Sequence, residues 1–196
     1  MNKGSASVSN LEAYRRYCAG LCSYDDLIKG IVHRTPNQKM IAGTELHKHI
    51  ENGYVPQKFQ TPCGLTVIMP DKEISLYAGN PEISGEWVSR EGYCVRGRAD
   101  AVDFETVYDH KLTSSGGYRD SFQWRLYLMI FNARLFIYNI FQCGDILNNQ
   151  LFVRDFTTEE YTRYSGMDDE CNDLVSDYMK FIYPAILEEK LNARKI

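Results

Sequence analysis

The stretch VRGRADAVDFETVYDHKLT, residues 95–113, decides the fold. Runs rich in β-branched and aromatic residues flank the tetrapeptide DFET at 103–106, a pattern that predicts two antiparallel strands joined by a tight turn. With the turn at DFET, Val102 pairs with Val107. This register decides which side chains face one another, because a one-residue slip moves every side chain to the opposite face.

The predicted register brings three charged side chains together. Asp100 lies opposite Asp109, where Cβ atoms are about 4.5–5.5 Å apart. Lys111 shares the face of Asp109, because side chains alternate along a strand. Two carboxylates so close repel each other unless they share a proton or a cation. The competing interpretation is a set of solvated polar positions on an open sheet.

A carboxylate pair beside a lysine suits a hard divalent cation. Mg²⁺ is typically held by one or two carboxylates, with water and substrate phosphate in the remaining positions. Such an ion would polarise a phosphoryl oxygen and lower the pKa of a bound water, while Lys111 could orient that water or offset charge at the phosphorus. His47 is a further candidate ligand, favoured by Mn²⁺ more than by Mg²⁺. Its spacing with Met40, Gly43 and Ile50 equally predicts the buried face of a helix.

The rest of the chain predicts helices around a mixed sheet, an α/β (α+β) fold. We expect one domain over 1–196, with a helical N-terminal part at 1–53, a sheet core at 64–156 and C-terminal helices at 158–193. Asn10, Ser23 and Asn37 are the predicted N-caps of the early helices, and Pro184 marks a break. The strand candidates are GLTVIMP, EISLYAG, GEWVSR, YCVRGRADAV, TVYDHKLT and NNQLFVRDF, and a long helix is expected over 120–141.

Composition limits the function classes. With 196 residues, of which 44% are hydrophobic and 24% charged, the chain can bury one substantial core. The absence of an apolar run of about 18 residues and of a secretory signal favours the cytoplasm, without a membrane partner. The net charge of −4 disfavours a general electrostatic nucleic-acid binder. Basic residues crowd the first quarter and form either a positive face or an ordinary surface; they are Arg15, Arg16, Lys29, Arg34, Lys39 and Lys48.

The six cysteines include no closely spaced pair of metal-ligand type. We expect buried, reduced thiols, with Cys18 and Cys22 on the inner face of one helix.

Four short motifs occur in a characteristic order: GTELHKHIE at 43–51, GRAD at 97–100, DHK at 109–111 and QWRLY at 123–127. Together they resemble the RecB-like exonuclease branch of the PD-(D/E)xK nuclease superfamily, which includes phage and bacterial exonucleases and CRISPR-associated nucleases. The resemblance implies a restriction-endonuclease-like core. Three features are less typical. Ala99 stands where the superfamily name expects proline, and Glu82 or Glu86 could supply the acidic residue common in the preceding strand. Iron–sulfur relatives have one early cysteine and a closely spaced trio after the QxxxY motif, whereas here only Cys143 and Cys171 follow it, 28 residues apart, so no iron–sulfur cluster is expected.

The resemblance also implies a role for each matched residue. The metal ligands would be His47, Asp100, Asp109 and the backbone carbonyl of His110. Lys111 would be the catalytic lysine, acting with the two aspartates. Gln123 and Tyr127, which are neighbours on one helical face, would bind substrate.

The function expected from these motifs is hydrolysis of DNA phosphodiester bonds with Mg²⁺ or Mn²⁺. The resemblance favours an exonuclease or DNA-end-processing enzyme in recombination, repair or phage DNA metabolism, in a bacterial or phage-infected cell. DNA ends are the expected partner, with a recombination or replication protein as a second. Two alternatives stay open: a catalytically retired nuclease fold that binds DNA or protein, and an endonuclease within a larger complex.

Overall fold

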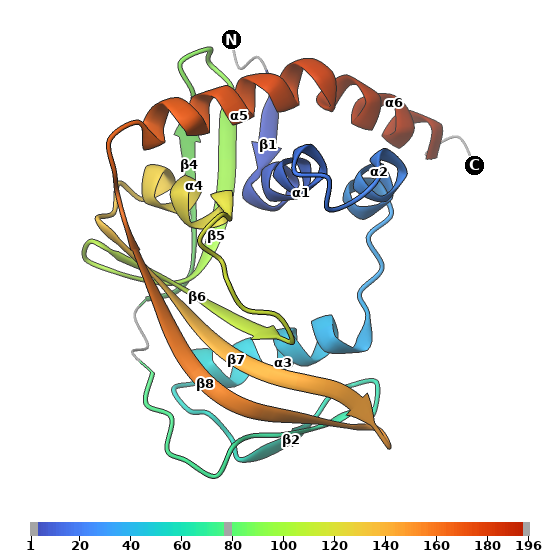
Figure 1. Ribbon diagram of the computed structural model, residues 1–196, viewed down its shortest axis with the longest axis vertical. Helices are drawn as coiled ribbons and strands as arrows, with labels where there is room; N and C mark the ends of the chain where they lie inside the picture. Colours follow the sequence, from blue (N-terminus) through green and yellow to red (C-terminus); the bar gives the residue numbers. More distant parts are fainter. Residues whose placement is uncertain (1–3, 77–79, 194–196) are drawn as a thin grey trace.

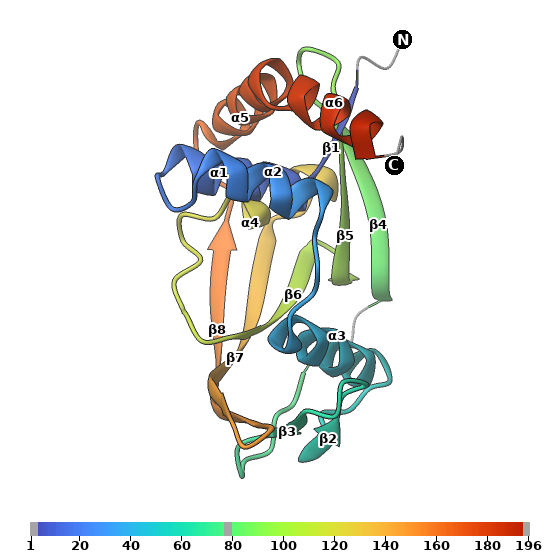
Figure 2. The same ribbon diagram turned by 90° about the vertical axis from the view of Figure 1, so that its right-hand side faces the viewer.

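The computed structural model describes residues 4–76 and 80–193, and is shown in Figures 1 and 2. An eight-stranded mixed sheet runs in the order β1-β5-β6-β7-β8-β3-β2, with β4 paired to β5. The strands are β1 (Ser5–Ser7), β2 (Lys58–Gln60), β3 (Thr66–Ile68), β4 (Asn80–Val88), β5 (Cys94–Asp103), β6 (Thr106–Thr113), β7 (Leu135–Leu147) and β8 (Gln150–Thr162). The helices are α1 (Val8–Cys18), α2 (Tyr24–Val32), α3 (Gln38–Glu51), α4 (Phe122–Ile130), α5 (Met167–Phe181) and α6 (Tyr183–Ala193). The predicted fold class, a mixed sheet flanked by helices, is confirmed.

The β5–β6 hairpin has the predicted register. Val102 pairs with Val107, and Ala101 with Tyr108. The loop itself is the dipeptide Phe104–Glu105, with Phe104 in the left-handed region at φ 45°. Beyond Ala101 the two strands separate: β5 continues along β4, whereas β6 continues parallel to β7. Asp100 and Asp109 therefore lie where the sheet forks, and they are not the directly opposed strand pair that the sequence predicted.

Two buried clusters lie on either side of this fork. The larger joins α1, α2, α4, α5 and α6 to β5, β6 and the first half of β7. The smaller lies under α3, whose Ala42, Leu46 and Ile50 pack on β2, β3 and the far ends of β7 and β8. Figure 1 shows the five helices of the larger cluster at the top and α3 apart from them, lower down.

Two glycines let α4 lie close to the sheet. Gly85 and Gly97 face each other on β4 and β5. A Cβ atom at Gly97 would come within 2.6 Å of Cε1 of Tyr127, and one at Gly85 within 2.6 Å of Cγ2 of Ile130. No larger side chain fits at these two positions without a shift of its neighbours. Gly97, the glycine of the GRAD motif, therefore allows α4, which carries the QWRLY motif, to pack closely against β5.

The predicted helix over 120–141 is wrong in its second half. Helix α4 ends at Ile130, Asn132 adopts φ 48°, and β7 starts at Leu135. Residues 136–141 are almost all buried because β7 is central in the sheet and covered on both faces. A strand of this kind loses the alternation that would distinguish it from a buried helix.

Other boundaries also differ from the prediction. The helices predicted from residue 158 begin at Met167, because β8 extends to Thr162. Strands β1 and β2 lie outside the predicted sheet core at 64–156. Residues 73–76 of EISLYAG form no strand, and residues 77–79 lie outside the described residues. The helix break near Pro184 is confirmed, with Ile182 between α5 and α6.

The predicted N-caps Ser23 and Asn37 are confirmed. Asn10 is not a cap; Ser7 caps α1 by accepting a hydrogen bond from the Asn10 amide. Cys18 ends α1 and is exposed, and Cys22 lies in the following turn, so these two cysteines do not share a buried helical face. Across the described parts of the chain, no helix is both long and apolar enough to traverse a bilayer.

Candidate active site

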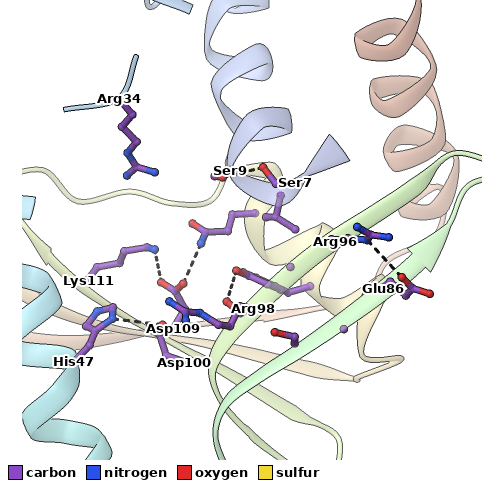
Figure 3. A pocket seen from close by; sticks show the side chains of 16 residues that line it. Ser7, Ser9, Arg34, His47, Glu86, Arg96, Arg98, Asp100, Asp109 and Lys111 are labelled. Atoms are coloured by element: carbon purple, nitrogen blue, oxygen red, sulfur yellow. Dashed lines mark hydrogen bonds and ion pairs between the residues drawn. The ribbon is translucent and has the colours of Figure 1, made fainter. Parts of the chain in front are cut away.

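Six sequence-predicted residues line one cavity of about 860 Å³ at the fork of the sheet. They are His47 from α3, Asp100 from β5, Asp109 and Lys111 from β6, and Gln123 and Tyr127 from α4. Figure 3 shows His47 beside Asp100 and Lys111 beside Asp109, at the centre of the cavity. Residues up to 80 positions apart in sequence, from His47 to Tyr127, thus meet at one site.

Asp100 bridges β5, β6 and α3. Its Oδ2 accepts a hydrogen bond of 2.7 Å from the backbone amide of His110, and its Oδ1 lies 3.4 Å from Nδ1 of His47. Burial, followed by the charge of Asp109, raises the pKa of Asp100 to about 6. The carboxylate pair expected from the register therefore interacts electrostatically, as like charges at close range do.

Asp109 is 4% exposed, and its two carboxylate oxygens have different partners. Its Oδ1 accepts a hydrogen bond of 2.9 Å from Nε2 of Gln123. Its Oδ2 lies 2.5 Å from Nζ of Lys111 in an ion pair, yet accepts no hydrogen bond of good geometry from any described residue. A buried carboxylate oxygen without a full set of donors is costly unless a cation compensates it.

Lys111 is held by its negative neighbours. Burial alone would lower its pKa, but the close negative charge of Asp109, with the charge of Asp100, outweighs burial and raises the pKa above its ordinary value. Nζ also lies 5.7 Å from the centre of the Tyr138 ring. Lys111 is therefore a fixed ammonium group facing the cavity.

The two histidines have different environments. His47 donates from Nε2 to the backbone carbonyl of His110 across 2.7 Å, so Nδ1 is the ring nitrogen that faces Asp100. His110 is buried, and burial, followed by the charge of His47, lowers its pKa to about 4. Its Nδ1 lies 3.1 Å from Nδ2 of Asn139, which donates to it.

The donor set fits a divalent cation in an open site. Nδ1 of His47 and Oδ1 of Asp100 face each other across 3.4 Å, and Oδ2 of Asp109 lies beside Lys111 in an ion pair without a hydrogen bond of good geometry. Within residues 4–76 and 80–193, no group of three or more His, Cys, Asp or Glu side chains forms a ready-made metal cage. Mg²⁺ needs none, because one or two carboxylates suffice when water and phosphate complete the octahedron.

Helix α4 contributes in two ways. Gln123 fixes Asp109, whereas the hydroxyl of Tyr127 donates to the backbone carbonyl of Arg98 across 2.7 Å. The Tyr127 ring is 6% exposed and packs against Phe131 and Phe136. Both side chains thus hold the strands that carry the aspartates. Their predicted role in substrate binding stays a prediction.

Of the two glutamates left open by the sequence, only Glu86 lines the cavity, where it pairs with Arg96 at 3.6 Å. Glu82 pairs with Arg98 at 3.3 Å.

Sequence reasoning missed several residues that complete the site. Arg34, between α2 and α3, points into the cavity above Lys111 (Figure 3). Asn139 was hidden in the predicted helix, but its register opposite His110 follows once β7 is a strand. Glu12 joins α1 to α4, because its carboxylate accepts from Oγ of Ser121 and the amide of Phe122. No local pattern marks Arg34 or Glu12.

Comparison with solved structures identifies the fold. The crystal structure of SSO0001 is similar with a TM-score of 0.55 and 17% identity, over 93% of this chain and 78% of that one. The alkaline exonuclease LHK-Exo from Laribacter hongkongensis is similar with a TM-score of 0.50 and 15% identity, over 97% of this chain and 94% of that one. No family model and no curated protein sequence matches the chain. Identities this low show the fold alone: this chain shares its fold with a solved exonuclease.

Proposed function

We propose that this protein is a metal-dependent deoxyribonuclease of the RecB-like branch of PD-(D/E)xK nucleases, acting on DNA ends. One observation carries the proposal: Asp100, Asp109 and Lys111 converge in one cavity at the fork of the sheet, where the charges of the two buried carboxylates interact. The fold shared with an alkaline exonuclease supports the same reaction class.

The proposed roles follow from the contacts. Asp100 and Asp109 would hold Mg²⁺ or Mn²⁺, with His47 and the His110 carbonyl at its side. When bound, the ion supplies Lewis-acid activation of a phosphate oxygen and a water of lowered pKa. Lys111, fixed by Asp109, would orient the attacking water and neutralise charge that develops on the phosphate oxygens.

Gln123 would act as a positioning residue, because its amide holds the Asp109 oxygen opposite the one that faces Lys111. Asn139 would hold the His110 ring, and with it the carbonyl that His47 contacts. These contacts preorganise the charged groups before substrate arrives, which is the main source of electrostatic catalysis.

A second candidate, a retired nuclease fold that binds DNA or protein, is favoured by the net charge of −4 and by the pairing of Arg96 and Arg98 with glutamates. Calorimetric titration with Mn²⁺ separates the two. An enzyme should bind Mn²⁺ in a manner that Asp100→Asn and Asp109→Asn each abolish. A retired fold should bind none at this site.

The cleavage test uses end-labelled linear single-stranded and linear duplex DNA, each with Mg²⁺, Mn²⁺ or EDTA. We expect metal-dependent loss of linear DNA by wild-type protein and none in EDTA. Intact DNA in every reaction, with protein shown to be folded by circular dichroism, would contradict the proposed activity.

A further inference from the structure

The first turn of α4 is held by a side chain from another helix. Oε2 of Glu12, on α1, accepts hydrogen bonds from Oγ of Ser121 across 3.0 Å and from the backbone amide of Phe122 across 2.8 Å. The Ser121 hydroxyl, the N-cap of α4, accepts in turn from the backbone amide of Gln123 across 3.1 Å. The amides of two successive residues are therefore fixed, one by the helix's own cap and one by α1.

Gln123 connects this turn to the candidate active site. Its backbone amide is bound by Ser121, and its side-chain Nε2 donates to Oδ1 of Asp109 across 2.9 Å. Only the side chain of one residue thus separates the anchored backbone from the Asp109 carboxylate. A displacement of the first turn of α4 would change the hydrogen bond that orients Asp109, and groups in a functional site must be held within about 0.5 Å of their productive positions.

Glu12 is itself held in place by α1. Its side chain is 19% exposed, and Oε1 forms an ion pair of 2.6 Å with Nη2 of Arg15, one turn further along the helix. Together with Ser121 and Phe122, Arg15 compensates a carboxylate that has left most of its water. The helix is anchored by Val8, Leu11 and Tyr14, which belong to the larger buried cluster. The Glu12 carboxylate is therefore a fixed point against which α4 is placed.

Glu12 borders open space on its other side. It lines a second cavity of about 590 Å³ between α1 and α2, which also reaches Lys111 and Gln123. Water can enter the space that a shorter side chain would leave in such a polar cavity. Truncation of Glu12 should therefore act on the first turn of α4 and leave the packing of the buried cluster intact.

We propose that Glu12 is a positioning residue of the metal site: through Ser121 and the first turn of α4, it holds Gln123 where that side chain orients Asp109. This role rests on the proposed function and adds to it a residue of α1, which lies outside all four sequence motifs. Loss of a group that orients a metal ligand typically costs about 10- to 100-fold in metal affinity or activity. For Glu12, which acts through another residue, we expect the lower end of this range.

Mn²⁺ affinity, measured by calorimetric titration of the full-length protein, tests this role. Glu12→Ala removes the contact. Arg163→Ala is the matched control, because Arg163 donates to the carbonyls of Leu128 and Ala133 at the other end of α4. Both variants loosen one end of the same helix, but only Glu12→Ala loosens the end that carries Gln123. Glu12→Ala should bind Mn²⁺ about 10-fold more weakly than wild type, and Arg163→Ala within about 2-fold of wild type.

Two further measurements separate positioning from a general loss of structure. High Mn²⁺ should restore most of the DNA-hydrolysis rate of Glu12→Ala, because Asp109 and Lys111 are intact. Ser121→Ala breaks the same contact from the α4 side and should also weaken Mn²⁺ binding, so the test does not depend on the folding of one variant. Circular dichroism at the titration temperature checks that each protein is folded.

A double-mutant cycle shows whether Glu12 acts through Gln123. Gln123→Ala should weaken Mn²⁺ binding by itself, and the addition of Glu12→Ala should cause no further loss, because the two changes break one chain of contacts. Glu12→Gln, whose amide oxygen can still accept from Ser121 and Phe122, should retain most of the affinity of wild type.

Three results would overturn the positioning role and leave the proposed activity intact: wild-type Mn²⁺ affinity in folded Glu12→Ala, an equal loss in Arg163→Ala, or independent losses that multiply in the double variant. The absence of Mn²⁺ binding by folded wild-type protein would instead overturn the proposed function, and the positioning role with it.

Discussion

At the scale of single residues, Asp109 is the buried charge that contacts the other residues of the candidate site. It is almost fully buried, receives one hydrogen bond from Gln123, pairs with Lys111 and raises the pKa of Asp100. Burying such a group is expensive compared with an apolar residue. In the proposed function, a bound cation would offset this cost in stability.

Asp100→Asn should stabilise the protein in EDTA at pH 8. The folded-state pKa is raised from 3.8 to about 6, so the stability linked to the protonated form is fully present below pH 3.8 and lost as pH rises through 6. The loss is on the order of 3 kcal/mol. Asparagine can still accept a hydrogen bond from the His110 amide but carries no charge. The melting temperature of the variant should therefore exceed that of wild type at pH 8, and the difference should shrink towards pH 5.

With Mn²⁺ present, wild type should melt at a higher temperature than Asp100→Asn, because the ion binds the folded wild type and stabilises it by mass action. A variant that melts lower than wild type in EDTA at pH 8, or that gains as much from Mn²⁺, would contradict the assignment of Asp100.

Gln123→Ala should slow DNA hydrolysis about 10- to 100-fold, the loss expected for one hydrogen bond to a charged group. Because Gln123 is proposed to position Asp109, the variant should also need more Mn²⁺ for half-maximal rate, with little change in melting temperature. Gln57→Ala, an exposed change outside the cavity, is the matched control. An unchanged Mn²⁺ requirement would refute the positioning role.

At the scale of elements, the close packing of α4 against β4 and β5 determines where Gln123 lies. Gly97→Ala should cost about 1–3 kcal/mol, because a Cβ atom would overlap the Tyr127 ring and Val8 in a packed interior. Gly116→Ala meets only Nε2 of Gln142 at 3.7 Å and should be nearly neutral. Chemical denaturation measures both. Equal stability of the two variants would show that the close approach is unimportant.

The sequence predicted the elements whose patterns are local. The β5–β6 hairpin was predictable because its turn and its alternation agree. Its register indicated that Asp100 and Asp109 lie near each other, but not that the strands separate before these two residues can pair. The six cavity-lining site residues belong to contiguous motifs and were named before the structure. Strand β7 was missed because a strand covered on both faces is apolar throughout. Arg34 was counted only among surface bases, because its place depends on how α2 and α3 pack on different clusters.

At the scale of the whole molecule, the candidate site lies between the two buried clusters, and Arg34, between α2 and α3, lines its cavity. Arg34→Ala should weaken binding of linear single-stranded DNA in EDTA and flatten the salt dependence. Each phosphate contact to single-stranded DNA adds about 0.7 to the slope of log affinity against log salt. Lys180→Ala, on α5 outside the cavities, should leave both unchanged. Fluorescence anisotropy at several salt concentrations measures the affinity and its salt dependence. Identical slopes of log affinity against log salt for the two variants would contradict the role of Arg34.

Hydrolysis of end-labelled linear single-stranded DNA by wild type and Lys111→Ala, in Mn²⁺ and in EDTA, tests the central claim most directly. Folding of both proteins at the assay temperature is checked by circular dichroism, with Lys180→Ala as the charge-matched control. The account predicts metal-dependent cutting by wild type and control, and a loss of at least about 100-fold in Lys111→Ala. Cutting at the wild-type rate by Lys111→Ala, or no cutting by folded wild-type protein, would contradict it.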